Sequence, residues 1–180
     1  MLQYRREWQK TGIANDHISY LSLSPNGDCL AIAGRKEVSI LTRETGKVKC
    51  ILRGQSQVTT LQWIPGGSPF ILLCTFEDGF IVTLTIHANG EVDVACEQAV
   101  SHVIHNCSLN ASGTLLATGS ENDVRIWEKD GEWWKEMQRL KSPPTYRDNH
   151  LVPMELVSLH WRKISRAKET LVTSYKRHGI

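Results

Sequence analysis

The sequence predicts an all-β protein, and three observations support this class. Short stretches of alternating apolar and polar residues, separated by turn residues, run along most of the chain, as is typical of β-strands. One such strand recurs four times, ending at Leu23, Trp63, Leu109 and Trp161, at spacings of 40, 46 and 52 residues. A period of about 40 to 45 residues is typical of four-stranded propeller blades. We therefore expect a partial β-propeller of about three and a half four-stranded antiparallel blades.

The second repeat shows the plan of one blade most clearly. Pro65-Gly-Gly, Glu77-Asp-Gly and Ala88-Asn-Gly are turn sequences that separate its apolar stretches. Each connection is short enough to join antiparallel neighbours. The four strands expected in this repeat are 58–64, 70–75, 80–86 and 91–96.

The other repeats follow the same plan. The strands expected are 17–24, 29–33, 38–42 and 48–52 in the first repeat and 103–110, 115–118, 124–128 and 132–137 in the third. The fourth repeat begins near Leu156, continues with a strand at 171–175, and has a turn and the start of a third strand at 176–180. The predicted blades are 15–53, 54–98, 99–140 and 151–180, preceded by an N-terminal strand or flap at 1–14.

Composition indicates an ordinary globular protein. Of the 180 residues, 41% are hydrophobic and 22% are charged. The five cysteines show none of the close pairings of a zinc knuckle, so we expect reduced thiols and an intracellular location, in the cytoplasm or nucleus. The opening residues lack a signal peptide, and no stretch reaches the about 18 apolar residues of a membrane span, so we expect no membrane association.

Several segments resemble the WD-repeat β-propeller family. Residues 119–128 (GSENDVRIWE) resemble its Gly-Ser, acidic turn and Val-Arg-hydrophobic-Trp strand. Its strand, turn and second strand are resembled by residues 109–118 (LNASGTLLAT) and 23–32 (LSPNGDCLAI). Residues 52–55 (LRGQ) occupy the place where family members usually have Gly-His. The resemblance covers roughly residues 15–175 and implies a rigid scaffold that assembles other proteins.

The repeats also depart from the family pattern. Many family members lock each blade with a hydrogen-bonded set of His, Ser or Thr, Asp and Trp. Here Gln55 replaces the His, and Leu41 and Leu84 replace the Trp of the first two repeats, whereas the third repeat has Trp127. We expect no blade to have a complete set.

A group of metal-ligand residue types precedes and enters the third repeat. His102, His105, Cys107 and the upstream Cys96 are of the types that bind zinc. On a strand, however, His105 and Cys107 share a face that His102 does not. We therefore expect packing roles, no bound metal and no cofactor.

Loops at one end of the blades are the candidate partner-binding surface. In WD-repeat proteins the connections between blades share an end with those between second and third strands, and loops on a rigid scaffold often bind partners. Alternation also turns one indole of the Trp133-Trp134 pair outward, and Trp134 is included as a candidate. The alternative for the loop residues is that they are simply good turn formers. The candidates are Arg35, Lys36, Arg53, Gln55, Glu77, Asp78, Glu121, Asn122, Asp123 and Trp134.

The predicted function is that of a non-catalytic protein–protein interaction scaffold, as a fragment of a longer propeller. The sequence has no phosphate-binding glycine loop, nucleophile elbow or His-Glu-x-x-His motif, so we expect no enzyme. The partners expected are other proteins, with a second copy of the chain or the missing half of the propeller as further candidates.

The alternative function is nucleic-acid binding through the basic C-terminal segment. Residues 139–180 hold nine Lys/Arg and three Asp/Glu, including Arg162, Lys163, Arg166 and Lys168. This run is placed in a loop after Trp161, where a solvated turn is the simpler interpretation, so nucleic acid is the less favoured partner.

Overall fold

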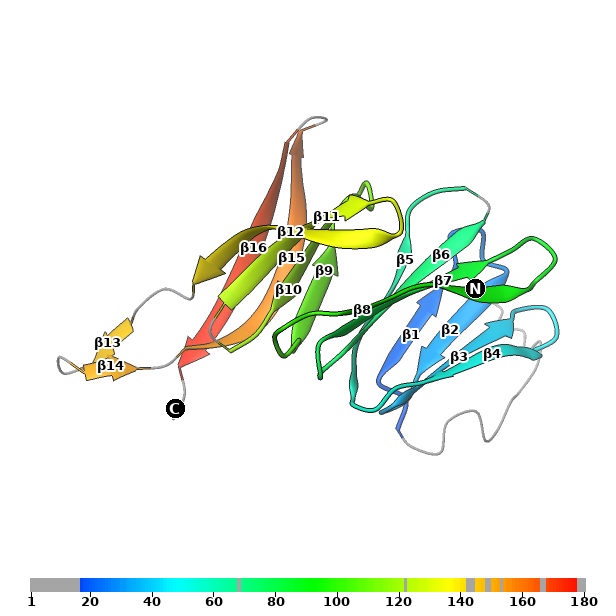
Figure 1. Cartoon of the computed structure of the whole chain (residues 1–180), viewed down its shortest axis with the longest axis horizontal. Coiled ribbons are helices and arrows are strands. Elements are labelled where there is room, and N and C mark those ends of the chain that lie inside the picture. The colour runs from blue at the N-terminus through cyan, green and yellow to red at the C-terminus, as the bar shows by residue number, and fades with distance from the viewer. Residues whose placement is uncertain are drawn as a thin grey trace, which may run out of the picture.

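The computed structural model describes residues 17–67, 69–121, 123–141, 145–147, 150–152, 154–165 and 168–177. In these residues the chain forms strands β1–β16 and no helix (Figure 1). Three antiparallel sheets have four strands each, in sequence order, and two more are two-stranded hairpins. The prediction of an all-β, open, partial propeller of four-stranded blades is confirmed.

Each four-stranded sheet is one blade. Blade one contains β1 (Tyr20–Leu23), β2 (Cys29–Ala33), β3 (Glu37–Thr42) and β4 (Val48–Arg53). Blade two contains β5 (Val58–Ile64), β6 (Phe70–Phe76), β7 (Phe80–Ile86) and β8 (Val92–Ala99). Blade three contains β9 (Asn106–Leu109), β10 (Leu115–Gly119), β11 (Asp123–Asp130) and β12 (Trp133–Lys141).

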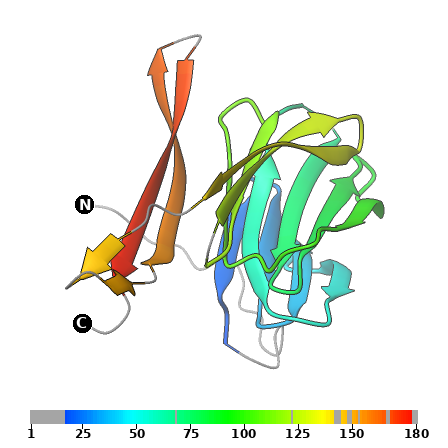
Figure 2. The same ribbon diagram turned by 60° about the vertical axis from the view of Figure 1, so that its left-hand side comes forward.

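Two hairpins follow the three blades. The short one contains β13 (Thr145–Arg147) and β14 (His150–Val152). The long one, called here the C-terminal hairpin, contains β15 (Met154–Ser165) and β16 (Lys168–Arg177). Figure 2 shows this hairpin standing at one end of the stack of blades, with its tip projecting beyond them. The predicted N-terminal strand or flap, at 1–14, lies outside the described residues.

Two expectations for the fourth repeat are wrong. Lys176, placed in a turn, lies in β16 opposite Glu155. The basic run, placed in a loop after Trp161, lies largely on strands, because Arg162 pairs with Thr170. The ladder between β15 and β16 continues beyond the length of the other repeats, as far as the pair of Ser165 with Lys168.

The first strand of the third repeat is shorter than expected. It begins at Asn106 rather than at 103. The reason is that Ile104 donates its backbone N–H to the carbonyl of Glu77, at 3.1 Å, so this segment crosses to blade two before the strand begins.

The blades stack face to face and bury their apolar side chains between them. Between blades one and two, the Trp63 Nε1–H donates to the Ser22 carbonyl at 3.1 Å. The same contact recurs between blade three and the C-terminal hairpin, where Trp161 Nε1–H donates to the Ser108 carbonyl at 3.0 Å. Equivalent strand positions therefore make equivalent contacts, as expected of stacked repeats.

Blades two and three are also tied at their outer strands. The Gln98 side chain on β8 accepts from the Trp134 N–H at 2.9 Å and donates to the Trp134 carbonyl at 2.7 Å. An amide side chain thus satisfies both backbone groups of a residue on the next blade.

Replacing Gln98 with alanine should weaken this contact. We expect Gln98→Ala to lower the free energy of unfolding by about 1–3 kcal/mol, because two hydrogen bonds are lost and the Trp134 N–H and carbonyl lose these partners. Chemical denaturation measures the change. The neighbouring Glu97→Ala, at an exposed position, serves as the control, and an equal loss in the two variants would contradict the prediction.

No helix of the described residues has the length and apolar character needed to cross a membrane.

Candidate functional site

A cavity of about 670 Å³ lies between blades two and three, at the end of the stack where β6 meets β7 and β10 meets β11. Its lining comes from these two turns, from Ser56 in the connection between β4 and β5, from the connection between β8 and β9, and from the side chains of Arg125 on β11 and Arg139 on β12. Four of the predicted binding residues line it, namely Glu77, Asp78, Glu121 and Asp123.

The β6–β7 turn is held in place by its neighbours. The Asp78 N–H donates to Ser56 Oγ at 3.0 Å, and the Glu77 N–H donates to the Gln57 carbonyl at 2.8 Å. The turn ends at Gly79, whose φ of 90° favours glycine. Its carbonyl accepts from the Val100 N–H at 2.8 Å. Both faces of the turn are therefore fixed, and the exposed carboxylates of Glu77 and Asp78 stand on a rigid base.

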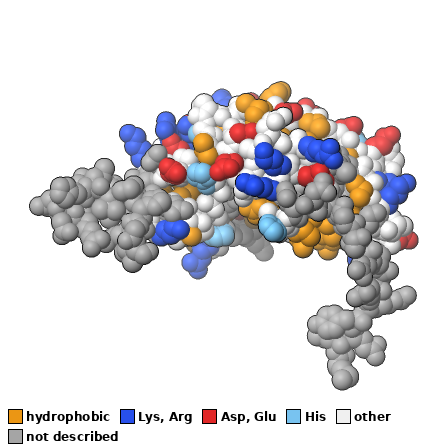
Figure 3. All heavy atoms as spheres, turned by 90° about the horizontal axis from the view of Figure 1, so that it is seen from below, with side chains coloured by type: hydrophobic (Ala, Val, Ile, Leu, Met, Phe, Trp, Pro, Cys, Tyr) orange, Lys and Arg blue, Asp and Glu red, His pale blue; other side chains and the backbone are white. Residues whose placement is uncertain are grey.

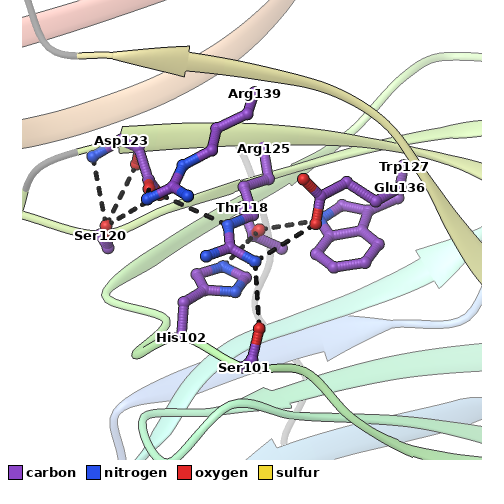
Figure 4. Close-up of polar contacts among 9 residues, drawn as sticks. All are labelled: Ser101, His102, Thr118, Ser120, Asp123, Arg125, Trp127, Glu136 and Arg139. Atoms are coloured by element: carbon purple, nitrogen blue, oxygen red, sulfur yellow. Dashed lines mark hydrogen bonds and ion pairs between the residues drawn. The ribbon is translucent and has the colours of Figure 1, made fainter.

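A network of charged side chains forms one wall of the cavity (Figure 4). Asp123, 3% exposed, accepts from Ser120 Oγ at 3.1 Å and pairs with Arg139 and with Arg125 Nε, the latter at 3.6 Å. Arg125 Nη1 also donates to Glu136 at 3.2 Å. Because Asp123 and Arg125 are both buried, each needs the other's charge, and this pairing fixes the β10–β11 turn against β12.

A second chain of contacts runs from the cavity into the core of blade three. Trp127 Nε1–H donates to Thr118 Oγ1 at 2.8 Å, and His102 Nε2 lies 2.9 Å from the same oxygen. Which of the two groups donates in the contact between His102 and Thr118 depends on the tautomer of the imidazole. The His102 ring also stacks on Trp127, with ring centroids 5.8 Å apart.

These contacts of His102, Thr118 and Trp127 include three of the four residue types with which the family locks a blade. Asp123, which would be the fourth type, binds Ser120 and the two arginines instead, and His102 Nδ1 has no hydrogen-bond partner among the described residues. Burial and the nearby Arg125 lower the pKa of His102 from 6.5 to about 4. The imidazole is therefore neutral at physiological pH.

The lowered pKa makes the stability of the protein depend on pH. The unfolded chain, with a histidine pKa near 6.5, binds the proton more readily than the folded chain. The contribution of neutral His102 is thus complete above pH 6.5 and declines as the pH falls toward 4. Because the side chain is only half-buried, we expect a loss of about 1–2 kcal/mol over this range.

Chemical denaturation between pH 7 and pH 4 tests this expectation. His102→Gln should flatten the pH dependence, whereas His160→Gln, at an exposed position on β15, should leave it as in the wild type. A profile that is unchanged in His102→Gln would contradict the assignment.

The other described loop candidates do not line this cavity: Arg35 and Lys36 lie in the turn between β2 and β3, Arg53 ends β4, and Gln55 follows in the connection between blades one and two. The Arg35 and Lys36 carbonyls accept from the N–H groups of Val58 and Gly54, at 2.7 and 2.8 Å. Arg53 pairs with Glu37 at 3.1 Å, on the surface. Gln55 is exposed, and Asn122 lies outside the described residues.

Trp134 is not on the surface, and its selection as the binding member of the tryptophan pair needs correction. Its side chain is 2% exposed and packs in the core between blades two and three, whereas Trp133 is 56% exposed. The alternation predicted one inward and one outward indole correctly, but only the blade stack decides which is which.

The group of histidines and cysteines does not assemble. His102 is bound to Thr118, and His105 lies 3.9 Å from Glu77. Burial raises the pKa of the Cys107 thiol to about 12, so it stays protonated. Within the described ranges, no three His, Cys, Asp or Glu side chains are placed to hold a metal ion.

Sequence reasoning missed several residues of the site, above all Ser101, Arg125, Glu136 and Arg139. The sequence contained one signal for this site. His102 precedes the first strand of the third repeat, as Gln55 precedes the first strand of the second repeat, and only the third repeat has a tryptophan, Trp127, on its third strand. The charged residues gave no comparable signal, because a buried Arg125 resembles an exposed one in the sequence.

The stacked, four-stranded antiparallel blades define a protein of the β-propeller class. Residues 71–128 match the family model "WD domain, G-beta repeat", which confirms the resemblance to WD-repeat propellers. A comparison with curated proteins gave no match.

Solved structures with the same fold include two WD-type propellers. The β-propeller domain of Cps50 (Swd1) from Myceliophteria thermophila has a TM-score of 0.62 and 17% identity, covering 80% of this chain and 46% of that chain. The WD40 domain of SCAP from fission yeast has a TM-score of 0.57 and 18% identity, covering 89% and 41%.

A third similar structure is a putative 6-phosphogluconolactonase from Bacteroides fragilis. Its TM-score is 0.59 and its identity 13%, covering 69% of this chain and 39% of that chain. This chain thus spans less than half the length of each of the three.

Proposed function

We propose that this protein is a non-catalytic interaction scaffold, and that a partner protein binds at the cavity between blades two and three. The observation that carries the proposal is the cavity itself, which gathers loop side chains of two blades on strands that are fixed by backbone hydrogen bonds. Loops held in this way on a rigid scaffold are suited to binding, because little ordering entropy is lost. The resemblance to WD-repeat proteins supports the same function.

The charge of the site favours a protein over a nucleic acid. The lining has four carboxylates, Glu77, Asp78, Glu121 and Asp123, against the guanidinium groups of Arg125 and Arg139. Phosphate groups bind to clustered positive charge. Figure 3 shows basic and acidic side chains interspersed on the face that it presents.

We also propose that these blades work as part of a longer ring. Blade faces are stabilised by stacking on further blades, and the similar structures are more than twice as long as the segment matched here.

The loop site can be tested by comparing partner binding of three forms of the chain. The test variant is Asp78→Ala/Glu121→Ala, at the cavity. The control is Asp28→Ala/Glu44→Ala, which removes the same charges from a second cavity, between blades one and two at the opposite end. Proteins retained by the tagged wild-type chain are identified, and the affinity of each purified partner is measured by calorimetry.

We expect the cavity variant to bind its partner at least about tenfold more weakly, and the control to bind as the wild type does. Weaker binding by the control alone, or equal binding by all three forms, would disprove the proposed site.

A further inference from the structure

The charged residues at the cavity between blades two and three, called here the loop cavity, fall into two groups. The first group forms the wall and is balanced, with two cations, Arg125 and Arg139, and two anions, Asp123 and Glu136 (Figure 4). Asp123 pairs with both arginines, and Arg125 Nη1 donates to Glu136 at 3.2 Å. Both guanidinium groups are thus already engaged with carboxylates of this chain.

The second group is not balanced in this way. It contains the carboxylates of Glu77 and Asp78 on the β6–β7 turn and of Glu121 on the β10–β11 turn, and all three residues are exposed. His105 Nδ1 lies 3.9 Å from the Glu77 carboxylate, which is too far for a hydrogen bond. Two turns from different blades therefore bring three anionic groups to one cavity, where their fields add.

The backbone holds these carboxylates in place. The Gly79 N–H closes the β6–β7 turn by donating to the Phe76 carbonyl at 3.0 Å, and the Ser120 N–H closes the β10–β11 turn by donating to the Asp123 carbonyl at 2.9 Å. Because both turns are closed, only side-chain rotation can separate the carboxylates, and their mutual repulsion persists in the free protein. A cation bound between the turns would reduce this repulsion with little reorganisation of the backbone.

The rest of the lining suits the stem of a long cationic side chain. Val103, 44% exposed, is an apolar residue of this otherwise polar lining. The neighbouring His102 ring stacks on Trp127, and its pKa of about 4 keeps it neutral, so it does not repel a cation. Lysine and arginine bury their methylene stems along such surfaces while the charged end stays among polar groups.

An anionic ligand fits the loop cavity poorly. A carboxylate or phosphate would have to approach the three turn carboxylates and then compete with Asp123 and Glu136 for the two guanidinium groups. Drawing the arginines away from Asp123, which is 3% exposed, would leave a buried carboxylate without its counter-charge, and this is costly. The arrangement of charge therefore selects a cation.

We propose that the loop cavity binds a lysine or arginine side chain of the partner protein, with the charged end between the β6–β7 and β10–β11 turns and the methylene stem against Val103. This inference rests on the function proposed above and names the chemistry of the segment bound there, which is basic. The cavity volume of about 670 Å³ is in the range that holds a ligand of this size.

The probe for this site is N-acetyl-arginine methylamide, a single arginine with its two peptide groups. The matched control is N-acetyl-citrulline methylamide, because citrulline has nearly the shape of arginine but no charge. Each compound is titrated into the isotope-labelled chain, and the NMR shifts of the backbone amides locate even weak binding. We expect saturable shifts at residues 77–79, 120 and 121 with the arginine probe, and at least about fivefold weaker binding of the citrulline probe.

Two charge-removing variants locate the bound cation. Asp78→Asn/Glu121→Gln removes two charges from the loop cavity with little change of shape, and should weaken binding of the arginine probe at least about fivefold. Asp28→Asn/Glu44→Gln makes the same change at the cavity between blades one and two and should leave the affinity unaltered. Circular dichroism shows whether each variant is folded. If the loop-cavity variant is not, the comparison of arginine with citrulline on the wild-type chain decides alone.

Three outcomes would overturn the inference: equal affinity for the two probes, no saturable shifts at the two turns, or an equal loss in the two variants. These outcomes are distinguishable from a failure of the proposed function. If Asp78→Ala/Glu121→Ala weakens partner binding but citrulline binds as well as arginine, the loop site holds its partner by other contacts and the inference is wrong. If the arginine probe binds as expected but the partner is unaffected by that variant, the cation site is supported and the proposed function fails.

Discussion

Trp127→Ala is expected to lower the free energy of unfolding by about 3–5 kcal/mol. Trp127 is 4% exposed and fills the space between blades two and three, so its removal leaves a cavity that the strands around it are too constrained to close. The substitution also removes the donor to Thr118 Oγ1 and the stacking partner of His102. For a chain of this length, such a loss corresponds to a fall of roughly 10 °C in melting temperature.

Two further variants separate the causes of this loss. Trp127→Phe keeps most of the ring but removes the hydrogen bond, and should cost less than the alanine variant. Trp133→Ala removes an exposed indole and should change stability by less than about 0.5 kcal/mol. Similar losses in Trp127→Ala and Trp133→Ala, measured by denaturation, would show that the indole of Trp127 is not part of the core.

Gly79→Ala is expected to destabilise the protein by about 3 kcal/mol, and to distort the loop site as well. A Cβ atom at this position would lie 2.5 Å from the His102 carbonyl oxygen and 2.6 Å from that of Val100. Both atoms belong to the backbone that connects blade two with blade three, so neither can move without breaking other contacts. The φ of 90° adds strain of about 1–3 kcal/mol for a residue with a side chain.

Gly131→Ala is the matched control, because it has a positive φ of 61° but nothing within 4 Å of the added Cβ. It should cost about 1 kcal/mol or less. The difference between the two variants in chemical denaturation therefore measures the clash with the connecting backbone. If both variants lose the same stability, the close approach at Gly79 has no energetic consequence and the prediction fails.

Six of the eight strands of the first two blades were predicted to within one residue at each end, whereas the strands expected at 17–24 and 91–96 are Tyr20–Leu23 and Val92–Ala99. The expected strands at 29–33, 58–64 and 80–86 have the observed bounds. Alternation, turn residues and strand length are local properties. In these repeats the sequences Pro65-Gly-Gly and Glu77-Asp-Gly strongly favour tight turns, which fix where the neighbouring strands end and begin. The error in the fourth repeat has the same origin, because the sequence 162–168 is basic and resembles a loop, although Arg162, Lys163 and Ser165 continue the ladder with β16.

The loop site could be predicted only in part. Glu77 and Asp78 were identified because they follow a strand and precede a glycine, which marks an exposed turn. Their meeting with Asp123 and Arg125, about 45 residues further along the chain, depends on how blade three stacks on blade two. No local sequence pattern specifies which residues of blade three meet this turn of blade two.

What the sequence alone determined, then, is the repeat: its period, its alternation and its turns specify four-stranded blades of the WD type, because each of these signals acts between residues close in the chain. The tertiary structure decided which face of each blade is buried and what it is buried against. Trp133 and Trp134 are chemically identical neighbours, and only the stacking of blade three on blade two, which buries the Trp134 indole in their shared core, places one in the core and the other in solvent. In the same way, the turn signals of the sequence predicted a short second strand at 171–175, and only the tertiary structure shows that β16 pairs with β15 over a longer stretch, Lys168–Arg177.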